Sequence, residues 1–437
     1  MAIDTQKSIY QFLTGDDEGR VCRDIPEEAC DDQPGNLLKH VLSLGATKTG
    51  DGLANPKLVL SWLLGILGAP AFLIGFLVPV REAGALLPQL FTAGYIRSLP
   101  LRKWVWALGS LVQGLSVAGM AFAALSLKGQ AAGWTIVGLL AVFSLARSIC
   151  SVSYKDVLGK TVSKSTRGTA TGTAGTISAV LVLAFGALLS LSILERSIAV
   201  VATALFVAAG LWIFAAGLFT TLKEVPGATS GGGNAIKAAL SQLSLLREDR
   251  QLFLFIVTRG FLISTALAPP YLIALSGHTS GRDFGQLGPF VVASALATAA
   301  SSFFWGRMSD KSSRKVLILS GIVGAISLAA ASLLGFFARG LIANTLVLPI
   351  LHFILMIAYQ GVRLGRSTHI VDMTDQDKRA SYTAVSNTMI GLLLIFGGAF
   401  GGVAYFAGES AVLGIFAVMA VMASLVARSL REVQAEE

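Results

Sequence analysis

The stretch that decides the fold is Gly306-Arg307-Met308-Ser309-Asp310-Lys311-Ser312-Ser313-Arg314-Lys315. A related stretch stands 212 residues earlier and reads Gly94-Tyr95-Ile96-Arg97-Ser98-Leu99-Pro100-Leu101-Arg102-Lys103. Each copy opens with glycine and closes with Arg-Lys, and the same offset pairs Arg167 with Arg379. A repeated half with a basic loop at a fixed place is typical of a transporter built from two related helix bundles.

Apolar segments of membrane length fill most of the remaining chain. It has 437 residues, of which 54% are hydrophobic and 14% charged, whereas soluble proteins carry about 25% charged residues. A membrane helix takes about 20 apolar residues. Twelve segments qualify, at 57–78, 83–97, 103–126, 132–154, 169–193, 197–221, 252–275, 285–306, 315–338, 344–366, 380–406 and 410–430. We therefore predict an all-α integral membrane protein with twelve transmembrane helices in two pseudo-symmetric six-helix bundles.

The positions of lysine and arginine predict how these helices are oriented. With the N-terminus inside, the five inner loops carry 18 such residues and the six outer loops carry 5. Because positive loops stay in the cytoplasm, this bias predicts a multi-pass protein of the inner membrane with both termini cytoplasmic. The net charge of +9 then reflects membrane orientation, and nucleic acid is not expected as a partner.

Composition divides the chain into four regions. Residues 1–56 are expected to form an acidic cytoplasmic tail, in which Asn36 starts a short amphipathic helix on the inner membrane surface. Residues 57–222 are expected to form the first bundle, and residues 251–432 the second. The connection, 223–250, combines a flexible glycine-rich linker with an amphipathic helix expected to lie along the inner face of the membrane.

The two basic stretches resemble the cytoplasmic signature loop of the major facilitator superfamily. That loop joins the second and third helices of each bundle, which is where both copies stand, and the resemblance covers residues 57–432. It implies two bundles that move by alternating access, with these loops closing the cytoplasmic side. The second copy lacks the usual glycine, and the first has Ser98 in place of the aspartate. The resemblance and the repeat together give the gating candidates Gly306, Asp310, Lys311, Arg314, Lys315, Gly94, Arg102, Lys103, Asp156, Arg167 and Arg379.

Two contacts of these loops are expected. Asp310 would face the N-terminus of the helix at 169–193, because unpaired N–H groups and the helix dipole favour an anion there. Arg102 or Lys103 would pair with Asp156 at the end of the preceding helix.

Three arginines fall inside predicted helices, Arg147, Arg259 and Arg363, whereas the same assignment places no acid in mid-helix. A charged side chain inside the membrane is costly and marks a site or pathway by default. In the superfamily, the helices that carry these arginines line the central cavity. Glu82, expected at the outer end of its helix, is the candidate for ion coupling. Polar residues that would complete the cavity are His352, Tyr359, Gln360, Trp62, Gln89, Gln113, Tyr271 and Asn387.

Cations without matching acids favour a small anionic or carboxylate-bearing organic solute, carried by a secondary active transporter through alternating access. Its expected partners are this solute, the lipid bilayer and a coupling proton or ion, and a monomer is expected. Two alternatives remain open: a proton-coupled exporter of drugs or lipophilic cations, and a non-transporting receptor or assembly factor of the same fold. The sequence contains no metal-ligand cluster, phosphate-binding loop or nucleophile pattern, so no enzyme activity, cofactor or metal is expected.

Overall fold

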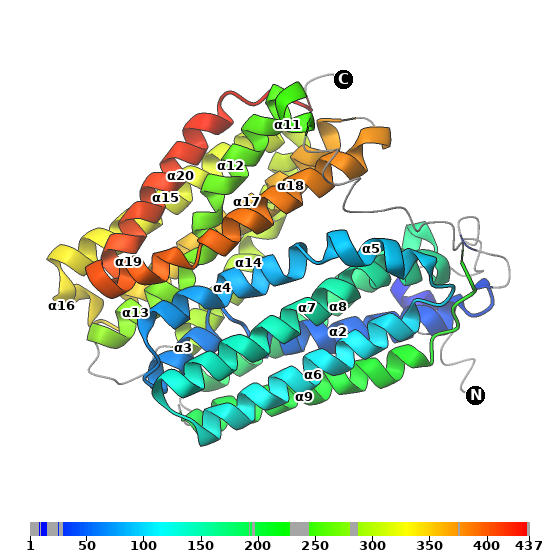
Figure 1. Cartoon of the computed structure of the whole chain (residues 1–437), viewed down its shortest axis with the longest axis horizontal. Coiled ribbons are helices and arrows are strands. Elements are labelled where there is room, and N and C mark those ends of the chain that lie inside the picture. The colour runs from blue at the N-terminus through cyan, green and yellow to red at the C-terminus, as the bar shows by residue number, and fades with distance from the viewer. Residues whose placement is uncertain are drawn as a thin grey trace.

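The structure is a computed structural model that describes residues 8, 10–14, 25, 29–191, 193–194, 197–227, 244–279, 287–374 and 376–434. Every regular element in these ranges is a helix, which confirms the predicted all-α membrane fold. Figure 1 shows the helices in two groups, one from the first half of the chain and one from the second half.

The helices of the first half are α2 (Gln33–Leu53), α3 (Val59–Ile66), α4 (Ala71–Leu86), α5 (Gln89–Ser98), α6 (Lys103–Ser126), α7 (Gly129–Thr161), α8 (Lys164–Ser190) and α9 (Ile198–Thr220). Those of the second half are α11 (Leu245–Glu248), α12 (Arg250–Leu267), α13 (Pro269–Thr279), α14 (Leu287–Lys311), α15 (Ser313–Phe337), α16 (Arg339–Ile342), α17 (Val347–Asp372), α18 (Gln376–Phe396), α19 (Ala399–Ala407) and α20 (Glu409–Ala427).

Side chains cap the starts of three long helices. Ser197 accepts a hydrogen bond from a backbone N–H of α9, Asp249 accepts two from α12, and Ser312 accepts one from α15. Each cap satisfies N–H groups that have no partner inside the helix, which fixes where the helix begins.

Within the described ranges, nine helices are long and apolar enough to cross a membrane, and α14, bent by 42° near its middle, adds a tenth. The predicted first span, 57–78, is wrong because the chain turns inside it. Gly68 adopts a φ of +74° there, and Pro70 precedes α4. Glycine tolerates this left-handed conformation and proline fits the start of a helix, so the turn is encoded locally. The segment therefore joins the end of α3 to the start of α4.

The helix that precedes this turn begins inside the predicted tail. α2 is a 21-residue helix, not a surface helix, and it packs along α8 and α9 in the first half. Gly50 lies so close to Trp212 that an added Cβ would stand 2.8 Å from the indole ring. The expected tail of residues 1–56 is therefore too long, because the first bundle already begins at Gln33. Hydropathy missed α2 because serine, threonine and glycine replace large apolar residues, as they do where membrane helices pack closely.

Helix breaks recur at the repeat offset of 212 residues. The break between α2 and α3 spans residues 54–58, and the break between α12 and α13 lies at Ala268. Discontinuous helices in corresponding positions of two halves are a common feature of transporter sites near the middle of the membrane.

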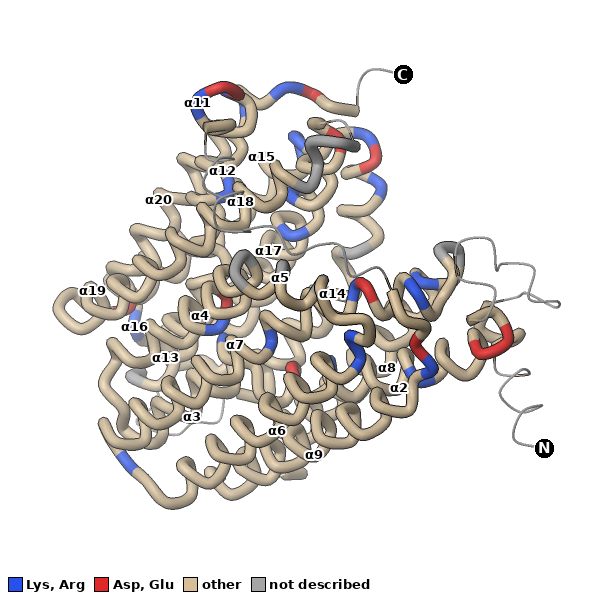
Figure 2. The backbone as a smooth tube through the Cα atoms, turned by 45° about the vertical axis from the view of Figure 1, so that its right-hand side comes forward, with Lys and Arg blue, Asp and Glu red and all other residues tan. Residues whose placement is uncertain are grey.

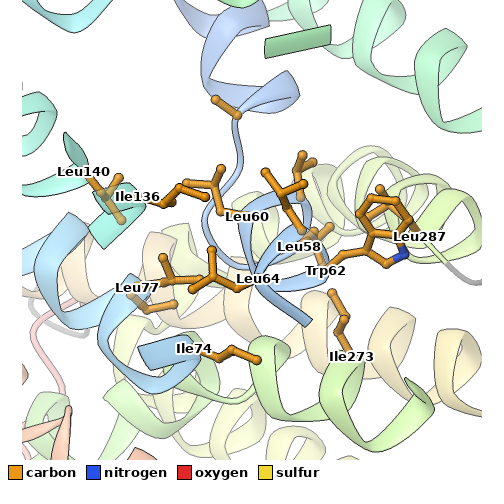
Figure 3. Packing of buried hydrophobic residues seen from close by; sticks show 14 of the residues in the cluster. Leu58, Leu60, Trp62, Leu64, Ile74, Leu77, Ile136, Leu140, Ile273 and Leu287 are labelled. Carbon is orange, nitrogen blue, oxygen red and sulfur yellow. The ribbon is translucent and has the colours of Figure 1, made fainter. Parts of the chain in front are cut away.

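The two halves meet most closely at one end. There α4 contacts α18 and α19, α8 contacts α14, and α3 contacts α13. A Cβ added to Gly75 of α4 would lie 2.6 Å from the Cα of Gly401 on α19. Figure 3 shows the apolar side chains that fill this region, with Trp62 and Ile74 from the first half beside Ile273 and Leu287 from the second. We call this the outer end.

The opposite end is charged, as Figure 2 shows for the lysine and arginine positions. It carries the connections between α5 and α6, between α7 and α8, and between α14 and α15. We call it the basic end, and the bias of lysine and arginine predicts that it faces the cytoplasm. The predicted amphipathic helix of the 223–250 connection falls mainly on residues 228–243, which lie outside the described residues.

Candidate functional site

A cavity of about 380 Å³ lies between the two halves and extends toward the basic end. Helix α4 of the first half lines one side, and α12, α17 and α18 of the second half line the other. Its walls bring together five of the predicted residues, namely Glu82, Arg259, Tyr359, Arg363 and Asn387. The volume is within the usual range for small-molecule sites.

Arg259 is the most deeply placed cation of this cavity, with 7% of its surface exposed. Its guanidinium donates hydrogen bonds to the hydroxyl of Ser386 and, at 3.3 Å, to the Oδ1 of Asn387. Its Nε has no hydrogen-bond partner. Neutral groups alone therefore hold this buried charge among the described residues.

Arg363 and Arg366 stand one turn apart on α17 and both line the cavity. Neither has a hydrogen bond or ion pair with the part of the chain that the structure describes. Arg366 lies close enough to interact electrostatically with Arg259. Arg363 and Arg366 also repel each other, because like charges three residues apart lie on the same face of a helix. Arg366 is absent from the predicted cavity residues, because it stands at the very end of the predicted segment 344–366.

Glu82 lies in the cavity wall, not at the outer end where it was expected. Its Oε1 is 3.8 Å from the Nζ of Lys57, which stands in the break between α2 and α3. The same ammonium lies 3.8 Å from the ring centroid of Tyr359 on α17. Lys57 therefore connects a carboxylate of the first half with an aromatic ring of the second.

Arg147 does not lie among the residues that line this cavity, and its partner is an acid that the sequence reading placed in the tail. Its Nη2 is 2.6 Å from the Oδ2 of Asp51, near the end of α2. The other oxygen of Asp51 is 3.1 Å from the Nη2 of Arg81 on α4. The sequence assignment placed no acid in mid-helix and left Asp51 in the tail, whereas the structure places Asp51 within the first bundle. Arg81 also lies in the interior, on α4.

Lys48 lies near the Asp51 ion pairs and contacts α8, where its Nζ donates to the carbonyl of Thr171 at 3.0 Å. It also lies within electrostatic range of Arg147 and Arg363.

A signal for α2 is present in the sequence. Small residues at 43, 45, 46, 47, 49 and 50 are typical of closely packed membrane helices.

Three predicted glutamines bond elsewhere. Gln113 is buried between α6 and α7, where it donates to the carbonyl of Gly109 and to the Sγ of Cys150. Gln360 donates to the Oγ1 of Thr298 on α14 at 2.7 Å. Gln89 donates to a carbonyl of its own chain segment. Their side-chain N–H groups are used for contacts between or within helices, while the Oε1 of Gln113 is buried without a partner among the described residues.

The remaining polar candidates lie away from the cavity as well. His352 is fully buried, shares a 2.8 Å hydrogen bond with Ser294 and packs against Phe290. Trp62 lines a second cavity, of about 520 Å³, at the outer end. Tyr271 is buried and packs against Phe416. Sequence position alone could not show which side of its helix each residue occupies.

The first basic loop makes the expected ion pair, because Arg102 contacts Asp156 of α7. Lys160 joins the same carboxylate at 2.8 Å. The sequence missed Glu224, whose fully buried carboxylate accepts from the backbone N–H groups of Arg102 and Lys103 and lies 3.2 Å from Lys160. Lys103 itself donates through Nζ to carbonyls at the end of α9. This loop is tied to its own half.

Replacement of Glu224 by alanine is expected to destabilise the protein. It leaves buried N–H groups at the start of α6 without an acceptor, which costs about 1–3 kcal/mol. Thermal unfolding of the purified protein in detergent measures the loss. Glu248→Ala, at an exposed position of α11, is the control and should leave the midpoint unchanged. Equal midpoints for the two variants would show that Glu224 does not stabilise the loop.

The second basic loop differs from expectation. Asp310 is exposed, and no ion pair or hydrogen bond joins it to α8 or to any other described residue. Arg314 donates to the carbonyl of Arg428 at 2.8 Å, which holds the loop against the end of α20. Lys311 is exposed, and the backbone N–H of Lys315 bonds the Ser312 cap.

The paired arginines of the repeat are only partly described. Arg167 donates to the carbonyls of Gly159 and Val162, at 2.8 and 2.9 Å, where α7 ends. Gly94 and Arg379 lie in α5 and α18, but their side-chain surroundings lie outside the described residues. Gly306 has open space around its Cα.

Comparisons with known proteins agree with this architecture. Residues 261–437 match the family model described as Major Facilitator Superfamily. A variant of the nucleoside transporter NupG superposes with a TM-score of 0.69 at 15% identity, covering 91% of this chain and 100% of that one. The inward-open xylose transporter XylE from E. coli gives 0.63 at 13%, covering 91% and 97%. A POT family transporter in complex with a thioalcohol-conjugated peptide gives 0.68 at 10%, covering 93% and 98%.

No curated protein matches the chain in sequence. At these identities the structural neighbours show the fold alone, and the family model covers the C-terminal part of the chain. The predicted resemblance is thereby confirmed: residues 261–437 match the Major Facilitator Superfamily model, and the chain has the multi-pass fold of its transporter neighbours.

Proposed function

We propose that the protein is a secondary active transporter that moves a small anionic or carboxylate-bearing organic solute across the inner membrane by alternating access. The cavity is the observation that carries this proposal. Arg259, Arg363 and Arg366 face it, and the carboxylate in its wall, Glu82, is already within range of Lys57. An anionic solute supplies the charge that these guanidinium groups lack.

The state of the two ends supports alternating access. The arginine-lined cavity extends to the basic end, whereas at the outer end the backbones approach closely at Gly75 and Gly401, beside the separate cavity of about 520 Å³. An inward-facing transporter requires a water-accessible cavity on one side and a close helix contact on the other. Its return to the outward-facing state requires these outer contacts to separate.

Coupling to protons requires a carboxylate within the bundle that can exchange a proton. Glu82 was the candidate from sequence. Asp51 is a second candidate, because both of its oxygens contact arginines of neighbouring helices, so loss of its charge would release α4 and α7 together.

The alternative of a lipophilic-cation exporter has less support. Asp51 and Glu82 each have cationic neighbours, and the described wall of the arginine-lined cavity holds more cations than acids. Extrusion of a cationic dye that depends on Glu82 would favour the exporter over the anion carrier.

Counterflow in proteoliposomes tests the proposed function. Pools of carboxylates, phosphorylated solutes, neutral sugars and organic cations are offered with and without a pH gradient. We expect exchange of an anionic solute that falls at least about tenfold in Arg259→Gln, since one charge-assisted contact contributes about 1.5–3 kcal/mol. Arg339→Gln, at an exposed position near the outer end, is the matched control. Exchange of a neutral or cationic solute that is unaffected by Arg259→Gln would contradict the proposal.

A further inference from the structure

The second half of the chain contributes three positive charges to the cavity wall and no carboxylate among the described lining residues. They are Arg259 on α12 and Arg363 and Arg366 on α17. Glu82 faces them from α4, and it lies within electrostatic range of Lys57, Arg81, Arg363 and Arg366. Its single charge therefore cannot balance the arginine cluster.

Holding three guanidinium groups together without an anion is costly. Arg363 and Arg366 share one helix face, where like charges repel. Arg259 is 93% removed from solvent, and its Nε has no acceptor. A buried cation without a counter-ion is strongly unfavourable unless a ligand supplies one. The cluster is therefore better matched to a bound anion than to an empty cavity.

The kind of anion follows from the number of donors. Three guanidinium groups present planar sets of N–H donors that match phosphate oxygens. A monocarboxylate has two oxygens and one charge, so that together with Glu82 it supplies two negative charges against three guanidinium groups. A phosphoryl group has three terminal oxygens and a charge near −2 at neutral pH. Ser367, Thr383 and Asn387 add neutral polar groups to the same wall.

We propose that this arginine cluster binds a dianionic phosphoryl group, so that the carried solute is a phosphate monoester. The inference rests on the proposed function and specifies its substrate class. The rest of the solute would extend toward Tyr359 and the apolar part of the wall, formed by residues such as Ile263 and Leu394. The doubly charged phosphate monoester differs from the phosphodiester of most lipid headgroups, which carries one negative charge.

Binding of small probes to the purified full-length protein tests the proposal. Methyl phosphate, dimethyl phosphate and acetate are titrated while thermal unfolding is followed, because a ligand of the folded state raises the midpoint by mass action. At pH 7.5 we expect methyl phosphate to bind at least about tenfold more tightly than either monoanion, as one further charge-assisted contact implies. Between pH 7.5 and 5 this advantage should disappear, because the second proton of a phosphate monoester binds near pH 6. Dimethyl phosphate, measured at the same pH values, controls for titration of the protein.

Substitutions of Arg363 and Arg366, which are less buried than Arg259, locate the site without changing that buried residue. Arg363→Gln and Arg366→Gln should each remove the preference for methyl phosphate, whereas Arg339→Gln should retain it. Equal binding of the three probes would overturn this inference and leave the anion-transport proposal standing. A preference that survives in both cavity variants would place the phosphoryl group elsewhere and overturn it too. No binding by any anion, together with exchange of a neutral solute, would overturn both proposals.

Discussion

Replacement of Gly401 by leucine is expected to abolish transport while leaving the protein folded. A Cβ at this position would stand 2.7 Å from the carbonyl oxygen of Phe72 and 3.0 Å from its Cα. Both atoms belong to the backbone of α4, so no side-chain rotation can relieve the clash. The larger residue therefore separates α19 from α4 and opens the outer end.

The size of this effect follows from the cost of overpacking, which is about 1–3 kcal/mol. That cost applies to the inward-facing state, in which the two backbones touch, and is relieved when the outer end opens. The ratio of inward-facing to outward-facing protein should fall by about 5–150-fold. Solute exchange should fall with it, because a transporter that cannot close its outer end cannot complete the cycle.

A cysteine reporter measures the change of state. Thr383→Cys places a thiol in the cavity at the basic end, and its rate of reaction with a membrane-impermeant maleimide is compared with protein lacking it. Gly401→Leu should slow this reaction by a factor similar to the population shift. Gly402→Leu is the matched control, since an added Cβ there meets open space. Unchanged labelling in Gly401→Leu, with transport retained, would show that this contact does not close the outer end.

Much of the fold is predictable because large-scale features depend on composition. The helices from α6 onward follow the apolar segments, and the two basic loops mark equivalent points of the halves. The arginines at 259 and 363 were found because a charge inside an apolar run is costly wherever it occurs. The contact of Arg102 with Asp156 was found because loop ends of adjacent helices are close.

The other site residues depend on contacts between helices that are far apart in the sequence. Asp51 looks like a tail residue because its helix is rich in small polar residues, and only the packing of α2 against α8 and α9 places it inside. Glu82 and Arg81 look like the end of a helix until α5 continues it. Gln113, Gln360 and His352 have the right chemistry for a site, but their rotation about the helix axis depends on neighbours that hydropathy does not reveal.

Asp51→Asn is expected to destabilise the protein. Asp51 contacts Arg81 and Arg147, and removal of its charge leaves two guanidinium groups facing a neutral amide inside the bundle. Loss of one partner of a fully buried pair costs about 3–5 kcal/mol. The Asp51 and Arg147 side chains remain 25% and 28% exposed, so water in the cavity reduces the expected loss to about 1–3 kcal/mol.

Thermal unfolding in detergent again supplies the measurement, with Asp32→Asn as the matched control. Asp32 pairs with Lys223 at 2.7 Å, but the Lys223 side chain is 69% exposed, so this pair should contribute at most about 1 kcal/mol. In the double variant Asp51→Asn with Arg147→Gln, one unpaired cation is gone, so part of the stability should return and the two effects should not add. Strict additivity would show that Asp51 and Arg147 act independently. If Asp51 also carries the coupling proton, Asp51→Asn should retain counterflow but lose accumulation driven by a pH gradient, a loss that Asp32→Asn should not share.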